Sequence, residues 1–429
     1  MVAPNSRTRP TAGALLALAL GVLFILGFVR AHPPQPGDGA ADASVPSPQI
    51  GDPLAHVESS EPPAEQTPSL VDAADAAIEQ QVLRLSDELG RMWTQEPESL
   101  VRVIEKASRS SSTSPPVTLL LAIAHAETHG KILTVSEAAA VGLAQATPVA
   151  YLLEGYGGKL FLTDDYFRGV SAYIVKKPLG DADAIATRML DRKKPLTPQR
   201  AARLHEAAVA LRREGLEELE VLRGHAPAWF FAGIESADRR NEAALTELER
   251  LIRANDRARL TEYRDRIRKE YRDLRSVQKD SWKQYQKDLM AERDATLVAF
   301  FGIPASEVNL KHRYLAADIL AERVDGRFSP ERMAEFLVRH LARKAAEAEA
   351  LETNRALLEQ MTAALYNGGA LNVKRMMAGL ITSLPETERY SVKVPTTRQR
   401  LDQSLAGGGA AGALTRAQAF RRRFDGCHG

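Results

Sequence analysis

The sequence has little cysteine, few aromatic residues and almost no net charge. Cys427 is the only cysteine among 429 residues, which excludes an intramolecular disulfide framework and a cysteine-based zinc site. Phe, Trp and Tyr make up only 6% of the chain. The 57 Lys and Arg nearly balance the 55 Asp and Glu, so no charge signal of a nucleic-acid-binding protein rises above background. We therefore expect no nucleic acid among its partners.

The composition otherwise suits a folded protein. Hydrophobic residues make up 44% of the chain and charged residues 26%, which excludes wholesale disorder, and the length allows two or three domains. Apolar residues recur mainly at spacings of three and four from about residue 71 onward, and no alternating segment is long enough to build a sheet. The sequence therefore predicts an all-α fold.

The first 30 residues predict a membrane segment. Residues 11–29, TAGALLALALGVLFILGFV, contain no charged residue and follow two arginines, Arg7 and Arg9. As a helix this run would be about 28 Å long, close to the thickness of a bilayer core. Its length favours an uncleaved anchor, although cleavage after Ala31 would make it a signal peptide. In either case we expect the rest of the chain to be exported.

Two further segments predict flexible chain. Residues 31–70 contain nine prolines and six acidic residues but no lysine or arginine, which is typical of an unfolded tether. Residues 405–429 are rich in glycine and carry the basic cluster Arg421-Arg422-Arg423, so we expect a flexible basic tail.

The middle of the chain predicts long helices. Between Gly233 and Gly302 there are 68 residues without glycine or proline, dense in charge. A loose apolar stripe at helical spacing comprises Leu245, Leu248, Ile252, Tyr263, Ile267, Tyr271, Leu274, Tyr285 and Leu289. This pattern predicts one or two long, exposed, coiled-coil-like helices.

Glu127 stands out because it ends an apolar helix. Residues 113–130, TSPPVTLLLAIAHAETHG, leave almost no polar face, and a helix that is apolar all round is buried. A carboxyl group delivered by such a helix to the edge of a core is poorly solvated. We therefore expect its pKa to rise, so that it can donate a proton near neutral pH.

Two other interpretations of Glu127 have to be considered. An acid at the end of a helix is ordinarily exposed and without special function. His125 and His129 lie four residues apart, on one helix face, and could hold a metal. In the zincin pattern, however, the glutamate adjoins the first histidine, and no third ligand is evident here. We therefore expect no metal and no cofactor.

Motifs that follow Glu127 favour a catalytic role. Ser136 comes nine residues after Glu127, and Gln145 comes eighteen residues after it. The motifs, in chain order, are VGLAQATP at 141–148, ALYNGG at 364–369, Asn372-Val373, and PETERY at 385–390. This series resembles the soluble-type lytic transglycosylases, whose catalytic domain has a goose-lysozyme-like fold. The segment 305–327 also resembles the helix that precedes the Tyr-Asn motif of that family.

The resemblance covers 98–154 and 304–394, roughly a third of the chain, and the motifs depart from the family pattern in places. The family's Glu-Ser is Glu127-Thr128 here, which keeps a hydroxyl group. Ala144 replaces the methionine of Gly-Leu-Met-Gln, and Thr147 stands where a second methionine is common. Leu365 replaces the alanine before Tyr-Asn. These departures affect the lining of the sugar groove more than the chemistry.

The resemblance implies cleavage of the β-1,4 bond between N-acetylmuramic acid and N-acetylglucosamine, with formation of 1,6-anhydro ends. It makes Glu127 first the acid and then the base. The residues that it assigns to substrate binding are Ser136, Gly142, Gln145, Thr147, Tyr366, Asn367, Glu386 and Tyr390. Ser136 and Gln145 would bond sugar groups, Tyr366 would lie near the reacting centre, and Glu386 and Tyr390 would line the groove. A structural role is the better interpretation of Asn367.

The implied architecture is a lysozyme-like domain made of 71–154 and 304–404, interrupted by a charged helical insertion at 155–303. The expected location is the bacterial inner membrane with a periplasmic domain, and the expected partner is the peptidoglycan glycan strand. The inserted helices could bind a protein. Two other functions remain open, namely a peptidoglycan or chitin hydrolase on the same fold and a non-catalytic glycan-binding scaffold.

Overall fold

A computed structural model describes residues 70–93, 96–303, 307–308 and 312–406. Within these ranges the chain is helical and contains no β-strand, only two isolated bridges in the loop after Glu127, so the all-α prediction is confirmed. No helix in the described part of the chain is long and apolar enough to cross a bilayer. The predicted membrane segment 11–29 and nearly all of the predicted linker 31–70 and tail 405–429 lie outside the described residues.

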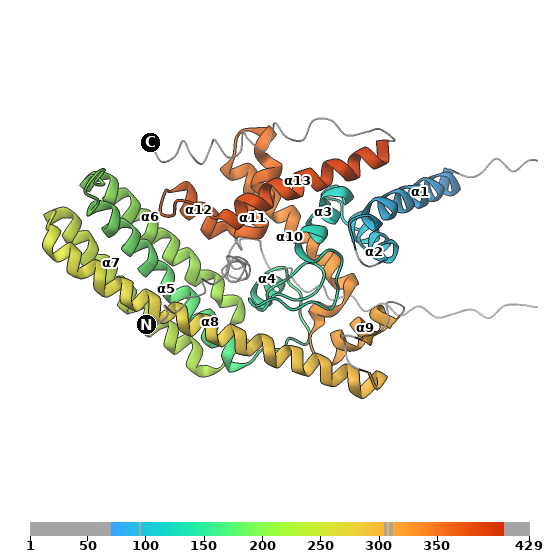
Figure 1. The fold of residues 1–429 in the computed structure, drawn as a ribbon, viewed down its shortest axis with the longest axis horizontal. Helices are drawn as coiled ribbons and strands as arrows, with labels where there is room; N and C mark the ends of the chain where they lie inside the picture. The colour runs from blue at the N-terminus through green and yellow to red at the C-terminus, as the bar shows by residue number, and fades with distance from the viewer. Residues whose placement is uncertain (1–69, 94–95, 304–306, 309–311, 407–429) are drawn as a thin grey trace, which may run out of the picture.

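Most of the helices follow one another with short connections, but a longer loop over 129–147 separates α3 from α4 (Figure 1). In chain order they are α1 (Leu70–Gly90), α2 (Glu98–Arg109), α3 (Val117–Thr128), α4 (Pro148–Leu153), α5 (Asp164–Met189), α6 (Pro198–Glu217), η1 (Glu218–Leu222), α7 (Ala228–Ala254), α8 (Arg257–Phe301), α9 (Arg313–Arg323), η4 (Gly326–Phe328), α10 (Pro330–Leu351), η5 (Arg355–Leu357), α11 (Leu358–Gly368), α12 (Ala370–Met377) and α13 (Pro385–Ala406).

One hydrophobic core lies among α1–α4, α10, α11 and α13, in the middle and right of Figure 1. The predicted apolar helix is α3, and Leu120, Leu121 and Ile123 on it are fully buried. Helix α3 packs against α13, and α11 packs against both α10 and α13. The two ends of the described chain therefore build this core together.

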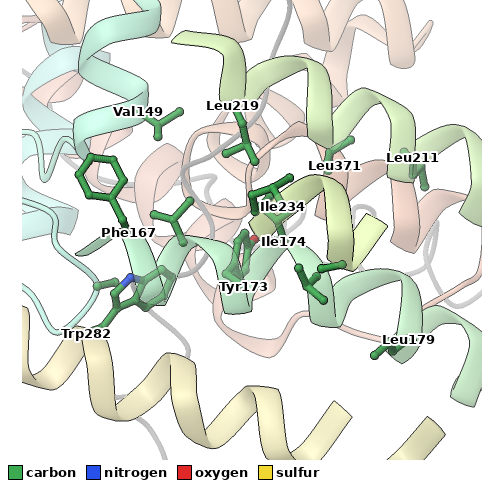
Figure 2. Packing of buried hydrophobic residues seen from close by; sticks show 14 of the residues in the cluster. Val149, Phe167, Tyr173, Ile174, Leu179, Leu211, Leu219, Ile234, Trp282 and Leu371 are labelled. Carbon is green, nitrogen blue, oxygen red and sulfur yellow. The ribbon is translucent and has the colours of Figure 1, made fainter. Parts of the chain in front are cut away.

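The inserted helices α5–α8 form a second layer, with α5 in contact with α6, α7 and α8 (Figure 1). The predicted apolar stripe on α7 and α8 points into the interior of this layer. Seven of its nine members are buried, and Tyr271 and Leu274 are half-buried. Figure 2 shows Trp282 pointing from α8 toward α5, beside Phe167 and Tyr173. Gly169 permits this contact, since a Cβ atom there would lie 2.1 Å from the Trp282 ring.

Two long helices occupy the glycine-free segment, in agreement with the prediction of one or two. Helix α7 ends where Asn255 adopts a left-handed conformation with φ of 49°. Asp256 then caps α8, since its carboxylate accepts a 3.1 Å hydrogen bond from the Arg259 backbone N–H. Asparagine tolerates the left-handed region better than most residues, so the polar pair Asn-Asp separates the helices without glycine.

The second layer continues into the loop that follows Glu127. Val141 and Val149 belong to the same apolar cluster as residues of α5 and α8. In addition, Gln286 and Arg293 on α8 donate hydrogen bonds of 3.1 and 2.9 Å to the carbonyl oxygens of Val135 and Leu133. Helix α8 thus supports the first part of the loop 131–147.

A buried ion pair connects the loop 131–147 to the segment that precedes α10. Asp325 and Arg327 are both fully buried, and Arg327 Nη2 lies 2.7 Å from Asp325 Oδ2. The guanidinium also donates to the carbonyl oxygens of Ala139 and Ala146, at 2.7 and 2.9 Å, and to the Tyr285 hydroxyl at 3.1 Å. One side chain therefore joins the loop, the 3-10 helix η4 and α8.

Candidate active site

Glu127 lies in the last turn of α3, where its half-buried carboxyl group faces α13. The Tyr390 hydroxyl donates a 2.7 Å hydrogen bond to Glu127 Oε1. Next to it, Thr128 Oγ1 donates to the carbonyl oxygens of Ala124 and Leu143, each at 3.3 Å. The hydroxyl that replaces the serine of the family motif thus fixes the end of α3 to the following loop.

Burial raises the pKa of Glu127 to about 7. The hydrogen bond from Tyr390 and the ammonium group of Lys393 oppose this shift, whereas the carboxyl group of Glu386 adds to it. The effect of burial wins because removing a carboxylate from water costs more than one phenol bond restores. The predicted rise in the pKa of Glu127 is therefore confirmed, and the carboxyl group is half protonated near pH 7.

Tyr366 is fully buried beside this pair. Its hydroxyl donates a 2.9 Å hydrogen bond to the carbonyl oxygen of Ala144. Its ring lies nearly parallel to that of Tyr390, with centroids 6.4 Å apart and 8° between the planes. Burial and the nearby Glu127 carboxylate hold the pKa of Tyr366 well above its usual value. The structure thus brings Glu127, Tyr366 and Tyr390 together, from α3, α11 and α13.

Four of the predicted substrate-binding residues shape the loop around Ala144. Ser136 Oγ accepts hydrogen bonds from the backbone N–H groups of Ala138 and Ala140, and Thr147 Oγ1 caps α4. Gln145 has a φ of 47°, and its Nε2 donates to Thr134 Oγ1 and to the Gly142 carbonyl. These polar groups stabilise the loop, and contact with a sugar stays a prediction for each of them.

Gly142 is required by the loop itself. Its φ is 76°, and a Cβ atom there would lie 2.2 Å from the carbonyl oxygen of Arg327. Both observations demand glycine, since only glycine adopts this conformation freely and leaves room for the approaching backbone.

Glu386 and Asn367 lie where α13 begins. The Thr387 hydroxyl donates a 3.1 Å hydrogen bond to Asn367 Oδ1, so buried Asn367 anchors the start of α13, as the structural interpretation predicted. Glu386 Oε2 is buried and has no hydrogen-bond partner among the described residues, and burial raises the pKa of Glu386.

A cavity of about 760 Å³ opens beside Glu386. Its walls come mainly from α5, from α8 and from the segment 381–387, and the loop residues 137–138 and helix α12 also contribute to them. Sequence reasoning missed this cavity and also Lys393, whose ammonium group interacts with the Glu127 carboxylate. Lys393 follows Tyr390 by three residues on α13, so helical spacing could have identified it. The lysines of the cavity carry no such signal, because the cavity forms only where α5 meets α8.

The two histidines near Glu127 lie side by side, with ring centroids 4.6 Å apart. Trp93 Nε1 donates a 2.9 Å hydrogen bond to His125 Nδ1, and burial lowers the pKa of His125 to about 4. In the described ranges, no group of three or more His, Cys, Asp or Glu side chains could hold a metal ion.

Comparison of the chain with protein-family models, with curated proteins and with solved structures finds no match. The function is therefore inferred from the chemistry of the residues around Glu127.

Proposed function

We propose that the protein is a peptidoglycan lytic transglycosylase that cleaves the β-1,4 bond between N-acetylmuramic acid and N-acetylglucosamine. The observation that carries the proposal is the environment of Glu127. This carboxyl group has a pKa raised to about 7 and a fixed hydrogen bond from Tyr390. Glu386, one helical turn before Tyr390 on α13, lines a cavity of ligand size. A catalytic acid that must later act as a base works best with a pKa near the working pH.

In the proposed reaction, protonated Glu127 donates its proton to the glycosidic oxygen as the bond from that oxygen to C1 of the muramic acid breaks. The C6 hydroxyl oxygen then attacks C1, and its proton returns to the Glu127 carboxylate. The 1,6-anhydro ring closes, no water is consumed, and the glutamate regains its first protonation state. The Tyr390 hydroxyl orients the carboxyl group and stabilises it while it is charged.

The helices on either side of the insertion are proposed to form the goose-lysozyme-like domain, with α5–α8 inserted into it. Residues 11–29 are proposed to anchor the chain in the bacterial inner membrane, with the enzyme in the periplasm. The glycan strand of peptidoglycan is the proposed substrate.

Glu386 favours a second candidate, a hydrolase. Its carboxyl group is close enough to Glu127 to raise the pKa of that residue, and its buried Oε2 accepts no hydrogen bond from the described residues. Ionised Glu386 would be placed to take a proton from water. Glycosidases ordinarily use two carboxyl groups, one as acid and the other as base or nucleophile.

Mass spectrometry of digested peptidoglycan tests both candidates. Wild-type protein, Glu127→Gln and Glu386→Gln are incubated in parallel with purified sacculi. We expect anhydro-ended fragments from the wild type and from Glu386→Gln, and none from Glu127→Gln. Reducing ends that vanish in Glu386→Gln would establish the hydrolase instead. Absence of soluble fragments from the wild type would favour the non-catalytic glycan-binding scaffold.

A further inference from the structure

The cavity beside Glu386 has a distinctive charge. Six basic side chains line it, and they are Lys176, Lys177, Arg275, Lys279, Lys283 and Arg375. The acids that line it are Glu137, Asp181, Asp183 and Glu386. Asp181 is paired with Arg375 at 2.9 Å, and Asp183 is paired with Arg268, outside the cavity, at 3.0 Å. Five basic groups therefore face the cavity against two acids without a described ion pair.

Lys176 is the most informative of these groups. Only 8% of it is exposed, and none of the described acids forms an ion pair with it. Its ammonium lies 5.8 Å from the ring centroids of both Tyr173 and Tyr271. Burial, together with the nearby Arg275, lowers its pKa to about 8. A buried ammonium without an anion is costly, so a bound carboxylate would stabilise this position.

The ammonium group of the neighbouring Lys177 also has neutral groups as its contacts. Its ammonium donates a hydrogen bond to Asn372 Oδ1 and lies 4.4 Å from the centroid of the Tyr173 ring. Burial holds the pKa of Lys177 well below its usual value. The carboxylates of Asp181 and Glu218 oppose this shift, but neither lysine forms an ion pair among the described residues.

Helix α8 supplies the opposite wall. Arg275, Lys279 and Lys283 are spaced four residues apart, so they follow one another along one face of the helix. All three are exposed, and all three line the cavity. Between them Trp282 lines the same cavity and is buried against α5. The wall thus combines basic groups with an aromatic surface.

The segment 381–387 completes the cavity with a different surface. Ile381, Leu384 and Pro385 are apolar, and Glu386 follows them directly. Glu386 lies four residues before Tyr390, on the same face of α13, and the Tyr390 hydroxyl bonds Glu127. The cavity therefore begins one helical turn from the residue that holds the proposed catalytic acid. A ligand that fills the cavity would extend away from that acid, across an apolar strip and onto the basic walls.

We propose that this cavity binds a carboxylate-bearing peptide attached to the glycan strand whose bond lies at Glu127. The inference rests on the proposed function, since it places the glycan at Glu127. Basic groups spread over both walls suit several separate carboxylates, and the apolar strip and Trp282 suit the peptide chain between them. The volume of about 760 Å³ lies within the usual range of ligand pockets. The inserted helices would then serve substrate recognition.

Calorimetric titration of the full chain with a free stem peptide tests binding directly. The probes are a peptide released from sacculi by an amidase and the same peptide with its carboxyl groups amidated. We expect the carboxylate form to bind at least ten-fold more tightly than the amidated form. Lys176→Met and the double variant Lys279→Gln/Lys283→Gln should each weaken binding at least ten-fold. Lys287→Gln, an exposed lysine one turn further along α8 that does not line the cavity, should bind as the wild type does.

Equal binding of the two peptide forms, or equal effects of the cavity variants and Lys287→Gln, would overturn the inference. So would displacement of the peptide by equimolar inorganic phosphate or by a short DNA duplex, since either would show a general anion site.

A kinetic arm separates this inference from the proposed function. Cleavage of intact sacculi is compared with cleavage of glycan strands stripped of peptide, as the ratio of the two kcat/KM values. The ratio should fall at least ten-fold in Lys176→Met and stay unchanged in Lys287→Gln. A ratio that does not change in Lys176→Met would contradict the peptide site. Failure of the wild type to cleave either substrate would contradict the proposed function, and the calorimetry would still decide the inference.

Discussion

The hydroxyl of Tyr390 donates a 2.7 Å hydrogen bond to Oε1 of Glu127, across 263 residues of sequence. This bond joins α3 to α13 and holds the carboxyl group at the edge of the core. It also couples two groups that affect each other's ionisation, because it lowers the pKa of Glu127 and raises that of Tyr390. Removal of this bond by substitution should therefore change the pKa of Glu127, and that change can be measured.

The first prediction concerns the pH dependence of glycan cleavage. The reaction begins with protonated Glu127, so the rate should fall as pH rises through about 7, the pKa of that group. Tyr390→Phe removes a bond that favours the carboxylate, which raises the pKa further. Hydrogen bonds to charged groups contribute about 1.5–3 kcal/mol, and one pKa unit corresponds to about 1.4 kcal/mol. We therefore expect the alkaline limb to move upward by about one to two units. An alkaline limb that stays in place would show that another group controls it.

The second prediction concerns stability. An acid whose pKa is raised in the folded protein destabilises the fold once both states are ionised, and it has no such effect when both are protonated. For Glu127 the effect should grow between pH 4.5 and about 7, up to about 3 kcal/mol. Glu127→Gln should accordingly unfold at a higher urea concentration than the wild type at pH 8, and the difference should shrink at pH 4. A difference independent of pH would mean that burial does not perturb Glu127.

The third prediction tests the loop around Gly142. Gly142→Ala should destabilise the protein by about 3 kcal/mol or more, because alanine is strained at positive φ and its Cβ atom would meet the Arg327 carbonyl. Gly379→Ala is the matched control, since Gly379 has a φ of 77° and nothing within 4 Å of an added Cβ atom. The control should cost only about 1 kcal/mol in urea unfolding. Equal losses would show that Arg327 moves aside freely.

The fourth prediction concerns the buried pair of Asp325 and Arg327. Asp325→Asn leaves the fully buried guanidinium without its carboxylate, which should cost about 3–5 kcal/mol of unfolding free energy. The pair of half-buried Asp165 and exposed Arg168 offers a control, because Asp165→Asn should cost less than about 1 kcal/mol. Circular dichroism during urea unfolding gives both values. Similar values for the two variants would contradict the role of Arg327 as the anchor of the loop.

Helical spacing predicted much of the fold correctly. The burial of α3 followed from its lack of a polar face, and the stripe from Leu245 to Leu289 identified the side of α7 and α8 that packs on α5. The raised pKa of Glu127 followed as well, since an apolar helix that ends in a carboxyl group places it at the edge of a core.

Other features could not be predicted because they depend on contacts between distant segments. The hydrogen bonds that the Ser136 and Gln145 side chains make to their own loop were not predicted, and contact of either residue with a sugar stays a prediction. The inserted helices were expected to be exposed, yet α8 supports that loop through Gln286 and Arg293. Gln286 and Arg293 lie 151 and 160 residues from their partners in the sequence, so no local pattern could predict these hydrogen bonds.

The sequence by itself determined the helical class, the buried helix that carries Glu127 and the apolar faces of the long helices, because each depends on the periodicity of neighbouring residues. Only the tertiary structure decided that Tyr390 bonds Glu127, that Arg327 anchors the loop and that Lys176 faces a cavity. Those relationships depend on where whole helices pack, and burial at these contacts then sets the charge and the pKa of each group.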